Sequence, residues 1–389
     1  MQNNFKSYHL FLVYALGFLS AFSAALMAYI DSSFLSTLME QKFVGGVYTI
    51  AYIFVIFCFL VMPILLRRFG NYRVTLFLVV MELIALLGLA FLHTPIWLIL
   101  CLITNLTIIP LIYFSADIFL EGFSTNKETG VIRGIYLTSI NLAWVISQLI
   151  SGSIVIGGGY QKIYLTSFFL LTPIILILIL GLRSFKDTAY EVTNVWHTAL
   201  QVWNNKNLRN VFFSNFLLYF FYSWMIIYTP LYLSENLGFS WKEIGIIFSI
   251  MLLPFVLVQS PLGYLADKKW GEKEVLSLGF IITAISTGVI YFINGGSLIL
   301  WAIILFITRI GAAMIEVMCN VYFFKKVDGL NANIISLFRM SGTLAYLFGA
   351  VFATLILSFS LIGIKGLFIV LGLTMLLGLK FSLSLKDTK

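Results

Sequence analysis

The sequence predicts an all-α integral membrane protein with twelve transmembrane helices in two pseudo-symmetric six-helix bundles. Its composition, its repeated apolar runs and the placement of its basic residues support this fold class. Of the 389 residues, 61% are hydrophobic and 10% are charged, whereas soluble domains contain about 25% charged residues. So few charges cannot cover a surface that faces water. Lipid must therefore surround most of the chain.

Each predicted helix follows from one apolar run, because a membrane helix needs roughly 20 mostly apolar residues. Twelve such runs occur, at 8–30, 43–66, 74–92, 95–119, 132–154, 162–182, 210–233, 243–266, 275–293, 297–323, 334–358 and 362–384. The first run is long for a signal peptide and eleven more follow it. We therefore expect it to remain as the first helix.

The basic residues indicate the orientation of these helices, because Lys and Arg accumulate in cytoplasmic loops. With the N-terminus in the cytoplasm, nineteen of the 24 basic residues fall on the cytoplasmic side, four fall in outer loops and Arg309 lies within a span. We expect a multi-pass protein of the cell membrane with both termini in the cytoplasm. The same bias explains the net charge of +8, so no nucleic-acid partner is expected.

A polar interval at 183–209 divides the chain in the middle. Its apolar residues, including Trp196 and Trp203, recur at spacings of three and four. This pattern predicts an amphipathic helix on the inner membrane face. The expected domains are an N-terminal six-helix bundle at 1–182, this cytoplasmic linker, and a C-terminal six-helix bundle at 210–389.

The two halves also resemble each other. RRFG at 67–70 and DKKWG at 267–271 occupy equivalent loops, and LITN at 102–105 matches FITR at 306–309. Parallel repeats of this kind are typical of secondary transporters, in which the substrate binds between the repeats.

The stretch GYLADKKWGEKE at 263–274 resembles the loop signature G-x-L-A-D-R/K-x-G-R/K of the major facilitator superfamily. Gly263 matches the first glycine, Asp267 the acid, Lys268 the base and Gly271 the last glycine, with one extra residue before it. The resemblance covers the whole chain and implies the fold of that family. It also implies that this loop is a cytoplasmic latch, closed in the outward-facing state.

The loop of the first half departs from the signature, because Arg67 stands where the family has its aspartate. An acid such as Asp328 or Glu121 could form an ion pair with Arg67. Asp117 and Glu121 lie four residues apart, on one helix face. We interpret these two acids, together with Arg133, as a charged cluster that has a structural role in the inner gate. The predicted gate consists of Gly263, Asp267, Lys268, Gly271, Arg67, Arg68, Gly70, Asp117, Glu121, Arg133 and Arg339.

Three charged residues lie at membrane depth, where charge is costly and often functional. Arg309 and Glu316 share one face of the predicted tenth helix, about 10.5 Å apart along its axis. Either Arg309 binds an anionic or polar group and Glu316 carries a proton, or both belong to a static buried network. For Glu82 in the third helix, a pair with another residue that stabilises the fold is an equal alternative to a functional role.

Further candidate substrate or proton residues are polar or aromatic positions in helices that line the cavity in the family. They are Asn105, Asn141, Gln148, Tyr219, Tyr222, Trp224 and Tyr346. Each of these side chains could instead make a contact between helices.

The expected function is secondary active transport of a small solute by alternating access, as proton-coupled export of amphipathic or drug-like molecules. The alternatives are uptake of a sugar or an anionic metabolite, and a transporter-like sensor or scaffold that moves no solute. His9, His93 and His197 have no metal-ligand spacing, so we expect no enzyme, metal or cofactor. The expected partners are the solute, a proton and the lipid bilayer, and the expected state is a monomer.

Overall fold

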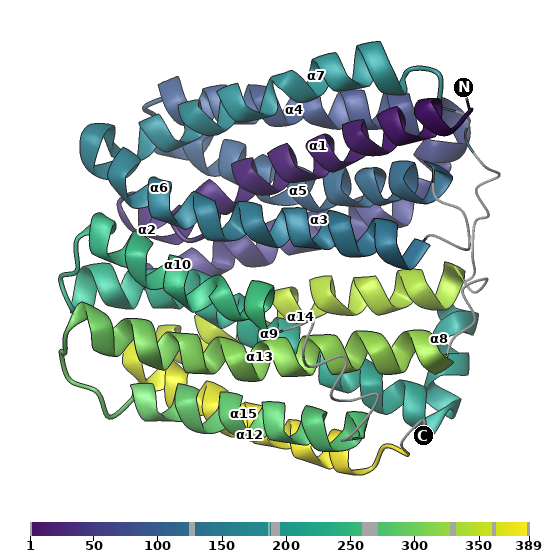
Figure 1. Cartoon of the computed structure of the whole chain (residues 1–389). Helices are drawn as coiled ribbons and strands as arrows, with labels where there is room; N and C mark the ends of the chain where they lie inside the picture. Colours follow the sequence, from purple (N-terminus) through teal and green to yellow (C-terminus); the bar gives the residue numbers. More distant parts are fainter. Residues whose placement is uncertain are drawn as a thin grey trace. The chain divides into compact units, whose positions relative to one another are not determined.

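The computed structural model describes residues 2–123, 129–185, 187, 195–258, 271–326, 332–359 and 363–386. Throughout these residues the regular structure is helical, and they contain no strand. The chain divides into two compact units (Figure 1). Unit 1 comprises Met1–Glu40 and Ile50–Val192, and unit 2 comprises Gln41–Thr49 and Thr193–Lys389. The predicted domain limits stay a prediction.

The first half of the chain forms helices α1 to α7. Their bounds are α1 Gln2–Ala28, α2 Asp31–Ser36, α3 Gln41–Phe69, α4 Asn71–Phe91, α5 Pro95–Phe123, α6 Thr129–Leu171 and α7 Pro173–Ile177, which continues into a π-helical turn, η1, at Leu178–Leu182. Within unit 1, α1 packs against α5 and α6, and α4 packs against the same two helices. Gly159 has a φ of 72°, which only glycine adopts readily. At this position α6 separates into two candidate spans, Ile135–Gly157 and Gly159–Leu182.

The second half forms helices α8 to α15. Their bounds are α8 Val195–Asn204, α9 Lys206–Leu231, the π-helical turn η2 Tyr232–Asn236, α10 Trp241–Leu257, α12 Glu272–Ile290, α13 Leu298–Lys326, α14 Ala332–Ser358 and α15 Ile364–Leu383. Side chains determine where two of them begin. Asn205 accepts hydrogen bonds from the first turn of α9, and Ser240 with Glu243 forms a capping box at α10; both satisfy backbone N–H groups that a helix start leaves unpaired.

Eleven helices in the described part of the chain are long and apolar enough to cross a membrane. The predicted spans at 43–66, 95–119 and 210–233 each lie within one of them, and the predicted span at 74–92 extends one residue past Asn71–Phe91. The predicted span at 243–266 begins in α10, but α10 contributes 17 residues and residues 259–270 lie outside the description. An all-helical membrane protein is therefore confirmed, whereas twelve helices in two bundles stays a prediction.

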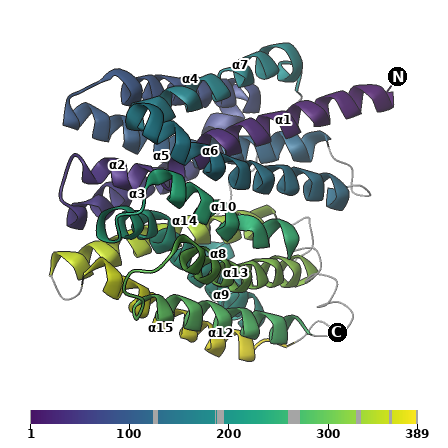
Figure 2. The same ribbon diagram turned by 60° about the vertical axis from the view of Figure 1, so that its left-hand side comes forward.

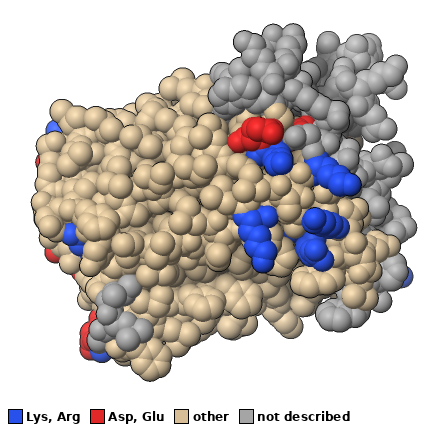
Figure 3. Space-filling view, turned by 90° about the horizontal axis from the view of Figure 1, so that it is seen from below, with Lys and Arg blue, Asp and Glu red and all other residues tan. Residues whose placement is uncertain are grey.

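Large apolar side chains are exposed along the helices. On α3, Ile53, Phe57, Leu60 and Ile64 are 53%, 62%, 51% and 56% exposed, at spacings that place them on one helix face. Figure 3 shows the protein from below; most of the described surface is uncharged, with Lys and Arg side chains gathered from the centre to the right and a few charged side chains at the left edge. An exposed apolar surface of this extent requires lipid rather than water.

Small residues bring the helices of unit 2 close together. α12 packs against both α13 and α15 (Figure 2). A Cβ atom on Gly311 in α13 would lie 2.8 Å from the carbonyl oxygen of Gly279 in α12. Glycine at this contact therefore lets the two backbones approach, which is how membrane helices commonly associate.

Gly311→Ala should destabilise the protein, because the added methyl group meets backbone atoms that cannot move aside. We expect a loss of about 1–3 kcal/mol, measured as a lower thermal unfolding temperature in detergent. Gly288→Ala is the matched control, since a Cβ there meets no atom within 4 Å and alanine favours the helix. Equal or higher stability of Gly311→Ala would contradict the close contact.

Candidate functional site

Arg309 is the one buried Lys or Arg among the described residues. It lies near the middle of α13 and is 1% exposed. Its guanidinium carbon lies 5.1 Å from the ring centre of Phe221 and 5.5 Å from that of Tyr222, both on α9. Aromatic faces attract a cation electrostatically. They leave its N–H groups free to donate elsewhere.

Two of those N–H nitrogens have no acceptor. The Nε and Nη1 atoms of Arg309 are buried and make no hydrogen bond in the described structure. A buried donor without a partner costs about 1–3 kcal/mol, and more when it is charged. The arrangement therefore provides a positive charge with two donors available for an anionic acceptor.

Glu316 is linked to Arg309 through Tyr222. The Tyr222 hydroxyl donates a 2.8 Å hydrogen bond to Oε2 of Glu316, while its ring lies beside the Arg309 guanidinium. Glu316 lies half-buried on α13, seven residues after Arg309. One tyrosine thus contacts the base with its ring and the acid with its hydroxyl.

The remaining aromatic candidates occupy two different environments. Tyr219 packs edge-on against Tyr222, with ring centres 5.7 Å apart, and against Tyr346 at 6.1 Å. Trp224 instead donates a 2.7 Å hydrogen bond from Nε1 to the Gly349 carbonyl oxygen on α14. The three tyrosines therefore form one aromatic group next to Glu316. The indole N–H of Trp224 instead holds α9 against α14.

The candidates in unit 1 form contacts between helices. The Nδ2 group of Asn105 on α5 donates to Oε1 of Glu82 on α4. The Nε2 group of Gln148 on α6 donates to the Ala25 carbonyl oxygen at 2.6 Å. Asn141 is half-buried on α6. Among the contacts of the described residues, the carboxyl group of Glu82 thus pairs with a neutral amide and with no basic side chain.

The predicted gate is described in part. Gly263, Asp267, Lys268 and Asp328 lie outside the described residues, and so does the side chain of Arg133. Of the others, Gly271 lies at the N-cap of α12, Asp117 is half-buried and Glu121 exposed on α5, and Arg67, Arg68 and Arg339 are exposed. The gate as a whole stays a prediction.

Asp187 occupies a position that the sequence did not single out. Its Oδ1 atom accepts a 2.8 Å hydrogen bond from the Asn71 backbone N–H, at the start of α4. Gly70, with a φ of 77°, leaves space for this carboxylate, since a Cβ there would overlap its Oδ2 atom. A carboxylate at a helix N-terminus is favourable. In the first half, where Arg67 replaces the family's aspartate, an acid from beyond α7 caps this helix.

These features define a class: an integral membrane protein with buried, incompletely paired charges inside its transmembrane helices, as in membrane transporters. Residues 211–388 match the family model of the Major Facilitator Superfamily. This part of the chain, slightly less than half of it, is similar to that family, and the match together with the eleven apolar helices supports a membrane transporter. The match confirms the predicted resemblance and lies entirely in unit 2. No curated protein matches the sequence.

Substitution of Asp187 should destabilise unit 1 in a graded way. Asp187→Asn removes the charge and should cost about 0.3–1 kcal/mol, whereas Asp187→Ala also removes the hydrogen bond and should cost about 0.5–2 kcal/mol. Thermal unfolding at low and high salt measures both, and the difference between wild type and Asp187→Asn should shrink in high salt. If all three proteins unfold at one temperature, Asp187 does not stabilise α4.

Proposed function

We propose that the protein is a secondary active transporter for a small amphipathic solute with an anionic group, coupled to protons and working by alternating access. The observation that carries this proposal is the buried Arg309 guanidinium with two unpaired N–H nitrogens. Among the sequence-based alternatives, this observation favours an acidic solute over a sugar or a cationic drug.

The charge and shape of Arg309 support an anion. Guanidinium N–H groups match a carboxylate or phosphate in a bidentate arrangement, with hydrogen bonds about twice as strong as those between neutral groups. A neutral solute would leave the buried charge uncompensated. A cationic solute would be repelled by it.

The tyrosines near Arg309 support an amphipathic solute. Tyr219, Tyr222 and Tyr346 make successive edge-on ring contacts, so large apolar faces surround a few polar atoms. Ligand sites in proteins have this composition, with apolar walls that bind the body of the ligand and few polar groups that orient it.

Tyr222 offers a physical route for proton coupling. A proton on Glu316 removes the negative charge that accepts the Tyr222 hydroxyl, and the ring of the same tyrosine lies beside the solute-binding base. Protonation of Glu316 then changes the free energy of solute binding at Arg309, and the reverse, which is the requirement for coupling. For the direction of transport we propose export, as expected from the sequence.

The test is flux in vesicles reconstituted with the protein, with a pH gradient of either direction. The solutes are an aromatic carboxylate, its neutral amide and an amine of equal size. We expect flux of the carboxylate, reduced about 10- to 100-fold in Arg309→Gln, because a hydrogen bond to a charged group contributes about 1.5–3 kcal/mol. Tyr222→Phe keeps the ring but should weaken the dependence on the pH gradient.

Lys365→Gln is the control, because it removes a positive charge at the start of α15. It should transport like the wild type. Undiminished flux in Arg309→Gln, or preference for the amine, would overturn the anion assignment. Absence of flux for all three solutes would favour the sensor or scaffold alternative.

A further inference from the structure

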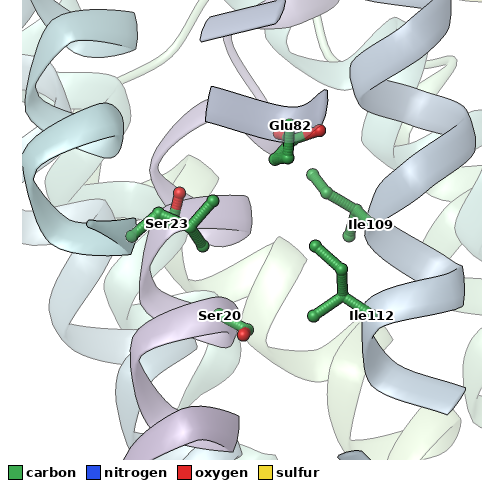
Figure 4. A pocket seen from close by; sticks show the side chains of 6 residues that line it. Ser20, Ser23, Glu82, Ile109 and Ile112 are labelled. Atoms are coloured by element: carbon green, nitrogen blue, oxygen red, sulfur yellow. The ribbon is translucent and has the colours of Figure 1, made fainter. Parts of the chain in front are cut away.

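Unit 1 contains a small cavity with both polar and apolar lining residues, apart from the cluster around Arg309. It is lined by Ser20, Ser23, Glu82, Ile109, Ile112 and Leu171 (Figure 4). The two serines come from α1 and Glu82 from α4, and α5 contributes the isoleucines. The cavity volume is about 10 Å³, close to the smallest space that holds one water-sized particle.

Three buried oxygen atoms in and beside this cavity have no hydrogen-bond partner in the described structure. They are Oε2 of Glu82, Oγ of Ser20 and Oδ1 of Asn105. These side chains are 1%, 5% and 0% exposed, and Asn105 is connected to Glu82 by its own amide hydrogen bond. Unpaired buried polar atoms are rare in folded proteins. Two of these atoms, on Glu82 and Ser20, belong to side chains that line the cavity, where they can accept a hydrogen bond from a ligand or coordinate one.

The charge in this part of the protein points to a cation. In the described residues of unit 1, Asp31 and Glu82 are buried acids at 2% and 1% exposure, and no Lys or Arg is buried. Asp31 accepts a 3.0 Å hydrogen bond from the Tyr164 hydroxyl, which offsets part of its charge. A buried carboxylate requires a compensating charge or a full set of donors. Glu82 has one amide donor.

The sequence repeat explains why the compensating charge is missing. Asn105 in LITN occupies the position that Arg309 occupies in FITR. The half of the chain with the arginine supplies its own cation at this position. The half with the asparagine has an acid and a neutral amide instead, so a proton or another cation from outside the chain can neutralise this acid.

We infer that Glu82, Ser20 and Asn105 form a binding site for a small monovalent metal cation of the Na⁺ type. All three atoms are oxygens, which hard cations prefer. A single carboxylate in the cavity matches a single positive charge.

Ser23 has a secondary position in this site. Its hydroxyl donates to the Ser167 carbonyl oxygen at 3.3 Å, and the Ser167 hydroxyl donates back to the Ser23 carbonyl oxygen at the same distance. These reciprocal bonds hold α1 against α6. They keep Ser20 facing the cavity while Glu82 approaches from α4.

The experiment measures thermal unfolding of the full-length protein in detergent, in NaCl, KCl or choline chloride at equal ionic strength and fixed pH. We expect Na⁺ to raise the unfolding temperature saturably, by a few degrees, because it binds the folded state alone. Glu82→Gln should abolish the Na⁺ response. Glu316→Gln, which removes an acid from unit 2, should retain it.

A second pair of variants tests the site if Glu82→Gln does not fold. Ser20→Ala should weaken the Na⁺ response, whereas Ser33→Ala should not, although the Ser33 hydroxyl is also buried and unpaired. An equal unfolding temperature in all three salts, or a full Na⁺ response in Glu82→Gln or Ser20→Ala, would overturn the inference. The assay uses no transported solute, so its outcome is independent of the role of Arg309.

Discussion

The absence of hydrogen-bonding partners in the lipid hydrocarbon is the constraint on which this structure depends. Backbone groups meet it by forming helices. Charged side chains meet it only by turning inward and finding partners within the protein. Arg309 and Glu82 are both buried almost completely, and the way each is compensated decides what its unit can bind.

The two units compensate their buried charges differently. In unit 2, the positive charge of Arg309 faces aromatic rings, and Tyr222 connects it to Glu316. In unit 1, the negative charge of Glu82 faces the amide of Asn105. Arg309 thus has unpaired donors and Glu82 has an unpaired acceptor, although the sequence predicts that Asn105 and Arg309 occupy equivalent positions of a repeat.

The loop before α4 also departs from the sequence signature of the family. In the first half, Gly70 and Asn71 receive the carboxylate of Asp187, which lies beyond α7. The family signature places its acid inside the loop itself, where this half has Arg67. The helix N-terminus favours a negative charge whichever segment supplies it. An acid from a distant segment can therefore meet the same electrostatic requirement and tie that segment to the start of α4.

The helices and their approximate limits were predictable, because an apolar run of sufficient length is a local property of the chain. The positions of Arg309, Glu316 and Glu82 within apolar runs were predictable for the same reason, and the loop signature predicted the family resemblance that residues 211–388 confirm. Glycine positions such as Gly311 were visible in the sequence, but the partner backbone was not.

The pairing of the buried groups was decided by the tertiary structure. The contacts of Tyr222 with both Arg309 and Glu316, of Asn105 with Glu82, and of Asp187 with Asn71 join segments far apart in the chain. So does the Tyr164 bond to Asp31, an acid that the sequence did not mark as buried. Such pairs depend on how each helix is rotated about its axis and which helix lies beside it. The sequence by itself determined which charges enter the membrane; only the packing of the helices decided which of them remain without a partner.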